Sequence, residues 1–112
     1  MTLDFTLSMI GWLAAAAFAA GAAINFVAPP SIRADYARWG YPNGFNFVTA
    51  VMESLVAIAL LFPSTRLWGA VLGALVMVVA AGTTLRHGEP KRAIAPSAFL
   101  ILCLIIIILT LT

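Results

Sequence analysis

Four long apolar stretches dominate this chain and limit what it can fold into. They cover residues 5–28, 45–62, 66–85 and 93–111. A bilayer core about 30 Å thick is crossed by about 20 helical residues, so each stretch has roughly the length of a transmembrane helix. The chain is 63% hydrophobic and only 9% charged, and it therefore lacks the polar residues that a water-facing shell needs. We predict an all-α polytopic membrane protein, a four-transmembrane-helix bundle that forms a single membrane domain over residues 1–112.

Prolines and short polar segments separate the apolar stretches. Pro29-Pro30 and Pro63 cannot continue a helix, so they end the first and second stretches. Residues 63–65 leave only a short turn, which makes the second and third helices antiparallel neighbours. The first stretch could also be the core of a signal peptide, but a signal peptide begins with a basic region and the only charged residue before this stretch is Asp4. We therefore expect a retained helix.

The longer first connection predicts a short amphipathic helix over residues 31–39. Ser31 is a residue type that caps helices, and Ile32, Tyr36 and Trp39 recur at the spacing of one helical face. Such a helix lies in the headgroup plane, where aromatic side chains anchor it at the membrane–water interface. An irregular loop with a few aromatic residues is the alternative.

The basic residues indicate the orientation in the membrane. Lys and Arg are enriched in cytoplasmic loops, and five of the six lie in the first and third connections: Arg33, Arg38, Arg86, Lys91 and Arg92. Arg66 is the only one on the other side. We expect the first and third loops in the cytoplasm and both termini outward. The basic residues form no run on one face, so nucleic acid is not an expected partner.

Glu53 is the most informative single residue, because it lies near the middle of the second apolar stretch. An ionised carboxylate at the bilayer centre costs at least about 2.5 kcal/mol on insertion scales. We expect this side chain to face the bundle interior, to be paired, or to be protonated. Asn46 and Thr49 lie on the same helical face, at seven and four residues before it. A ligand or proton site and an interhelical hydrogen bond remain equal alternatives.

Other polar residues occur at a matching depth. Asn25 is close to the end of the first helix, the pair Thr83-Thr84 is close to the end of the third, and Ser97 is near the start of the fourth. In an antiparallel bundle these positions all lie toward the first and third loops. The candidate ligand-binding residues are Glu53, Asn46, Thr49, Asn25, Thr83 and Thr84. They indicate either a vestibule open to the cytoplasmic side or ordinary polar residues at helix ends.

Several other features carry less information. Cys103 is the only cysteine and His87 the only histidine; we expect the first to behave as a small hydrophobic residue and the second to be a solvated loop residue. No metal site and no catalytic residue set is predicted. Gly69 and Gly73 form a GxxxG pattern, which allows close helix packing but leaves open whether the partner is within the chain or in another subunit.

Short motifs in a fixed order resemble the DoxX-like family of small four-helix membrane proteins. They are Trp39-Gly40-Tyr41-Pro42, Leu60-Leu61-Phe62-Pro63, Thr65-Arg66 with Gly69-Ala70, and Leu85-Arg86-His87-Gly88-Glu89. The resemblance covers about residues 10–110. It implies a four-helix membrane bundle with an acidic residue in the second helix, which Glu53 matches. Many relatives have a Thr-His pair at the end of the third helix; this chain has Thr83-Thr84 there and lacks the histidine.

Some members of the family are subunits of thiosulfate:quinone oxidoreductases or belong to membrane complexes linked to redox stress. The resemblance therefore leaves three functions open. The first is a non-catalytic subunit or small lipophilic-molecule binding protein with an internal polar site around Glu53. The second is a membrane subunit of a quinone-linked oxidoreductase complex, and the third is a small transporter. No cofactor is predicted, although a quinone fits the second function. We expect the bacterial inner membrane as the location, the lipid bilayer and a protein in a membrane complex as partners, and we leave a homo-oligomer open.

Overall fold

The computed structural model describes residues 2–112, and within them the chain is helical with no strand. Met1, the first residue of the predicted domain, lies outside the described residues. The all-α prediction is confirmed. The helices are, in chain order, α1 (Leu3–Val27), α2 (Pro30–Arg38), α3 (Phe45–Leu61), α4 (Arg66–Arg86), the short 3-10 helix η1 (Pro90–Ala93) and α5 (Ile94–Leu111).

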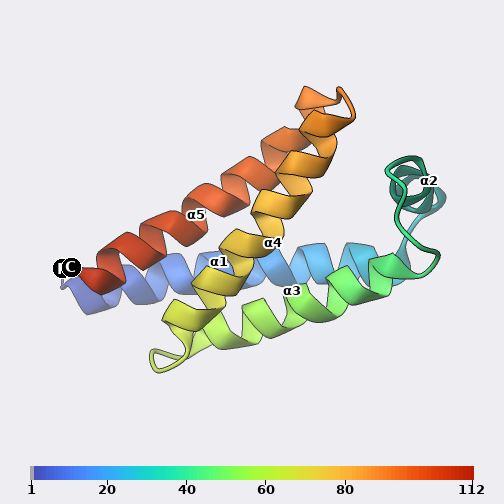
Figure 1. Ribbon diagram of the computed structural model, residues 1–112. Helices are drawn as coiled ribbons and strands as arrows, with labels where there is room; N and C mark the ends of the chain where they lie inside the picture. The colour runs from blue at the N-terminus through green and yellow to red at the C-terminus, as the bar shows by residue number, and fades with distance from the viewer. Residues whose placement is uncertain (1) are drawn as a thin grey trace.

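Local chemistry determines where α1 begins and ends. The hydroxyl of Thr2 accepts a hydrogen bond from the Phe5 backbone N–H at 3.1 Å, which satisfies one of the free donors at the helix start. At the other end Ala28 adopts a left-handed conformation with φ 46°. Pro30 then occupies the first position of α2, where a proline has no hydrogen bond to lose. The chain therefore turns sharply within two residues, and this places α2 across the end of α1 (Figure 1).

The long helices form two antiparallel pairs that cross each other (Figure 1). Helix α3 runs back along α1, and α5 runs back along α4; further contacts join α3 to α4 and α1 to α5. The start of α1 and the end of α5 lie together at one end of the molecule, while α2 lies at the other end of the α1–α3 pair (Figure 1). This arrangement brings the first connection and the α4–α5 connection toward the same end.

Three helical segments are long and apolar enough to cross a membrane: Leu3–Val27, Arg66–Arg86 and Pro90–Leu111. Helix α3 is apolar but has only 17 residues. At a rise of about 1.5 Å per residue, it is about 25 Å long, somewhat shorter than a bilayer core of about 30 Å. Three candidate spans are therefore established for residues 2–112, and the fourth span stays a prediction.

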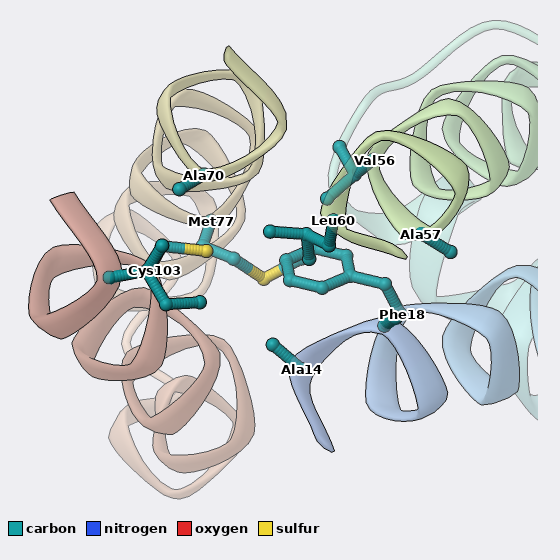
Figure 2. Packing of buried hydrophobic residues seen from close by; sticks show 10 residues of the cluster. Ala14, Phe18, Val56, Ala57, Leu60, Ala70, Met77 and Cys103 are labelled. Atoms are coloured by element: carbon teal, nitrogen blue, oxygen red, sulfur yellow. The ribbon is translucent and has the colours of Figure 1, made fainter. Parts of the chain in front are cut away.

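The core lies where the two helix pairs cross. Figure 2 shows the Phe18 ring reaching from α1 into the centre, where Met77 of α4 and Cys103 of α5 approach it. Phe18 and Cys103 are fully buried, and the Phe18 ring meets the Phe99 ring edge to face at 5.2 Å. Cys103 is thus packed as a small apolar residue, as predicted. Many bulky side chains on the outer helix faces are exposed, which suits contact with lipid.

The glycines of the GxxxG pattern pack within the chain. A Cβ atom added to Gly69 would lie 2.8 Å from the Ala59 Cβ and 3.1 Å from the Leu60 backbone nitrogen. One added to Gly73 would lie 2.9 Å from the Cys103 Sγ. Both positions therefore need glycine so that α4 can approach α3 and α5 closely. The structure thus gives both residues a role in intramolecular packing.

Arg66, the one basic residue at the opposite end from the first and third connections, is buried. It begins α4 and is only 6% exposed. Its Nε donates to the Leu60 carbonyl at 3.1 Å, and its side chain crosses the Cα of Gly11, where a Cβ would lie 2.6 Å from Nε. The side chain therefore folds back between α1, at Gly11, and the end of α3, because Gly11 leaves room for it.

Candidate ligand-binding site

Glu53 is enclosed between α3 and α1. Glu53 is only 3% exposed. Its carboxyl group lies so close to Gly21 of α1 that a Cβ atom added to this glycine would collide with the carboxyl oxygen Oε2. The absence of a side chain at Gly21 therefore creates the space that the carboxyl group occupies. The prediction that Glu53 faces the interior agrees with this position.

Asn25, one helical turn after Gly21, is the hydrogen-bond partner of Glu53. Its Nδ2 donates to the Glu53 Oε1 at 2.7 Å and to the Gly21 carbonyl at 3.1 Å. A backbone carbonyl can only accept, so the amide nitrogen must be on this side. The Asn25 Oδ1 consequently points the other way, where it accepts a 2.7 Å hydrogen bond from the Tyr36 hydroxyl. Glu53, Asn25 and Tyr36 thus form a continuous hydrogen-bonded chain from α3 through α1 to α2.

Asn46 supports this chain from the start of α3. Its Nδ2 donates to the backbone carbonyl of Asn25 at 2.8 Å. This carbonyl is among the last four of α1, which have no partner within their own helix. Asn46 is 6% exposed, and its hydrogen bond joins the two helices close to the Glu53 carboxyl. Its part is to position Asn25.

A cavity of about 490 Å³ lies between α3 and α4, and α2 and the first connection also contribute to its wall. This volume is in the range of pockets that hold small organic ligands. Most of the wall is apolar or aromatic. The lining residues are Tyr36, Trp39, Tyr41, Phe45, Thr49, Met52, Leu72, Leu75, Val76, Val79, Ala80, Thr83, Thr84, Arg92 and Pro96. Two smaller hollows of about 360 and 250 Å³ lie around Arg33 and Asn43, beside α2, and their walls combine helix residues with residues of the connection between α2 and α3.

Tyr36 belongs both to the hydrogen-bonded chain and to the cavity wall. Burial raises the pKa of its phenol, so the hydroxyl keeps its proton at neutral pH. Thr49 also lines the cavity; its hydroxyl donates weakly to the Phe45 carbonyl at 3.4 Å. Across the cavity, the Thr83 Oγ1 lies 2.6 Å from the Tyr41 hydroxyl, and the Thr84 hydroxyl donates to the Ala81 carbonyl.

The six predicted site residues therefore fall into two groups. Glu53, Asn25 and Asn46 form the buried chain between α1 and α3, while Thr49, Thr83 and Thr84 lie in the cavity wall. Tyr36 connects the groups, and neither it nor Tyr41 was among the predicted site residues. The sequence places Tyr36 on the apolar face of the predicted helix over residues 31–39 and Tyr41 just after it, which indicates only aromatic residues at the membrane interface. It does not show that the Tyr36 phenol meets Asn25.

An ion-pair cluster closes the end of the molecule beside the cavity. The Arg38 guanidinium forms two hydrogen bonds with the Glu89 carboxylate, at 3.1 and 2.6 Å, and the Trp39 Nε1 donates to the same carboxylate at 2.9 Å. Arg92 binds Asp35 at 2.7 Å. Asp35, Arg38, Glu89 and Arg92, which we call the loop clasp, join α2 to the connection between α4 and α5. Hydrogen bonds from Arg38 and then Trp39 lower the pKa of Glu89.

The remaining candidate groups lie outside this site. His87 is exposed and ends α4, with its Nδ1 2.8 Å from the Thr83 carbonyl. Ser97 is half-buried and does not line the cavity. Within residues 2–112 there is no group of three or more His, Cys, Asp or Glu side chains that could hold a metal ion.

Comparison with known proteins identifies the chain at the level of its family. The sequence matches the model of the DoxX-like family over residues 9–106. No curated protein and no solved structure matches the chain. The match covers most of the chain, including Glu53, Asn25 and every residue of the cavity wall. With its candidate membrane-spanning helices, this chain is a membrane protein of the DoxX-like family.

Proposed function

We propose that the chain is a non-catalytic binding protein for a small lipophilic molecule, which it holds in the cavity between α3 and α4. The observation that carries this proposal is the combination of an apolar cavity of about 490 Å³ with a few hydroxyl groups on its wall. Ligand pockets are typically apolar with a small number of placed polar groups. A lipophilic molecule reaches such a cavity by partitioning into the bilayer.

Glu53 contributes by fixing the polar wall rather than by touching the ligand. It does not line the cavity, whereas Tyr36 does. The hydrogen bond from Asn25 to Glu53 holds the amide in the orientation that Tyr36 needs. A ligand therefore meets a phenol whose position depends on a carboxyl group in the neighbouring helix. This arrangement gives the acidic residue a positioning role.

The side chains in the cavity support binding more than catalysis. The polar lining residues are hydroxyl-bearing Tyr and Thr residues, Trp39 and Arg92. No carboxylate, imidazole or thiol lies in the wall within residues 2–112, so this wall offers no base to activate a nucleophile. The binding protein would lie in the bacterial inner membrane with the loop clasp on the cytoplasmic side, as the excess of basic residues there indicates.

Energy transfer from Trp39 tests the proposal, because this residue lines the cavity while Trp12 and Trp68 are exposed on outer helix faces. Replacing the latter two with Phe leaves Trp39 as the only donor. The probe is N-phenyl-1-naphthylamine, which fluoresces in apolar surroundings, added to protein in lipid nanodiscs. We expect saturable transfer in this protein and its loss when Ala80→Phe places a phenyl ring inside the cavity.

A matched control is Val78→Phe, which adds the same ring to an exposed position of α4 outside the cavity wall. It should keep the saturable transfer. Transfer that never saturates, or that is equal in both variants, would show that the probe only dissolves in lipid and would overturn the proposed function.

A further inference from the structure

The hydroxyl groups of the cavity wall share one property: each has already donated its proton to the protein. The Tyr36 hydroxyl donates to the Asn25 Oδ1, and the amide orientation fixed by the Gly21 carbonyl leaves no alternative. The Thr84 hydroxyl donates to the Ala81 carbonyl at 2.8 Å. A hydroxyl group has one proton and two lone pairs. Tyr36 and Thr84 therefore retain only acceptor capacity for a ligand.

The other polar wall residues follow the same rule. Thr49 has its single proton directed to the Phe45 carbonyl, 3.4 Å away. Thr83 donates to the Val79 carbonyl at 2.8 Å, so in its 2.6 Å contact with Tyr41 the phenol must be the donor. The Trp39 N–H is bound by Glu89. The inner wall thus offers oxygen lone pairs and no free donor.

Arg92 is the exception, and it lies at the edge of the cavity. Its guanidinium keeps N–H groups beyond the ion pairs with Asp35 and Glu89. However, its side chain is 51% exposed, so a ligand acceptor that bound there would stay close to water. A group placed deeper, beside Thr49 and Thr84, meets acceptors alone.

We infer that the cavity selects lipophilic molecules that donate a hydrogen bond, such as phenols and alcohols, over molecules of the same shape that only accept. This inference rests on the proposed function. A hydroxyl group of the ligand would donate to the free lone pairs of Tyr36, Thr49 or Thr84, and its apolar part would lie against Leu72 and Val76. A quinone, whose carbonyl oxygens only accept, would find a donor only at the exposed edge, at Arg92, and none beside Thr49 and Thr84.

Selectivity for a donor can be measured with 4-octylphenol and its methyl ether, 4-octylanisole, which have the same ring and tail. Their affinities are compared by calorimetric titration of the protein in nanodiscs, with Ala80→Phe measured in parallel to subtract partition into lipid. We expect the phenol to bind about tenfold more tightly, a difference of about 1.4 kcal/mol, since the ether lacks the donated hydrogen bond and brings its own unpaired oxygen.

The matched variants Thr49→Val and Thr84→Val remove wall acceptors while keeping side-chain shape. The hydroxyls they remove donate to main-chain carbonyls of their own helix, so both variants should fold. Combined, they should reduce the tenfold preference to about twofold or less. An ether that binds as tightly as the phenol in the unmodified protein would overturn this inference and leave the proposed function standing. Failure of both compounds to bind above the Ala80→Phe level would overturn the proposed function and the inference with it.

Discussion

The amide nitrogen of Asn25 lies 2.7 Å from the carboxyl oxygen Oε1 of Glu53, and this hydrogen bond joins α1 to α3 within the apolar part of the molecule. The same amide holds Tyr36 through its oxygen. A polar residue that is costly to place in a membrane is therefore the end of a hydrogen-bonded chain that reaches the cavity wall.

Replacing Glu53 tests the strength of the interhelical hydrogen bond. Glu53→Gln keeps an oxygen that can accept from Asn25, whereas Glu53→Ala leaves the amide without this partner. We expect the alanine variant to lose about 1–2 kcal/mol of unfolding free energy relative to the glutamine variant, the upper range for hydrogen bonds between membrane helices. Reversible unfolding in mixed micelles with increasing denaturing detergent measures this difference. Equal stabilities would show that the bond does not hold α1 to α3.

Substitution of Gly21 should lower the stability of the protein as much as substitution of Glu53, which packs against it. A Cβ in Gly21→Ala would collide with the Glu53 carboxyl, so the carboxyl must leave its position or the helices must separate. We expect a loss of about 1–3 kcal/mol, as for other overpacked sites. Gly82→Ala is the matched control, because a Cβ there meets nothing within 4 Å; it should be neutral or slightly stabilising. The same detergent unfolding assay applies, and indistinguishable variants would contradict the tight fit.

The contact between α4 and α3 provides a second packing test at Gly69. The atoms that a new methyl group would meet there belong to the Ala59 side chain and to main chain near Leu60. Main chain cannot rotate away, so Gly69→Ala should push α4 from α3 and lower the unfolding free energy by about 1–3 kcal/mol. If instead this variant behaves like Gly82→Ala and its monomer is unchanged while a dimer is lost, the glycine serves contact between two chains.

The loop clasp predicts a pH dependence of stability. Glu89 has a pKa below its ordinary value of 4.5 in the folded protein, because Arg38 and Trp39 bind its ionised form. Its contribution is complete above the unfolded pKa and is lost as the pH falls through the lower folded pKa. We expect the Tm advantage of the unmodified protein over Glu89→Gln to be constant near neutral pH and to shrink on acidification below about pH 4.5. A gap that stays constant down to about pH 3 would mean that the carboxylate charge is not involved.

The elements follow from local signals that the sequence displays directly. Proline pairs and apolar runs place the helix ends, and the spacing of Asn46 and Glu53 puts them on one helical face. Contacts between residues that are far apart in the sequence cannot be predicted from these local signals. Nothing local reveals that the Tyr36 hydroxyl reaches Asn25 after the turn at Pro29-Pro30, or that Asp35 meets Arg92, which is 57 residues away.

The position of each polar residue along its helix, read from the sequence, also does not separate two distinct sites. These positions gather six polar residues at one end of the bundle, but the crossing of the helix pairs separates them into a buried chain and a cavity wall. In the sequence Arg38 informs only the orientation and Glu89 is only part of a family motif, since single charges in loops carry no information about their partners. The Tyr36 hydroxyl can be identified as a donor only when the positions of Gly21, Asn25 and Tyr36 are all known, because the Gly21 carbonyl fixes the orientation of the Asn25 amide.

Native mass spectrometry tests the central claim, that the cavity holds a lipophilic molecule, most directly. The protein is released from membrane-derived nanodiscs, and the masses of the unmodified chain, Ala80→Phe and Val78→Phe are compared. We predict a small adduct on the unmodified chain and on Val78→Phe that is absent from Ala80→Phe. Identical adducts on all three proteins, or no adduct on any of them even with 4-octylphenol added in excess, would contradict the account.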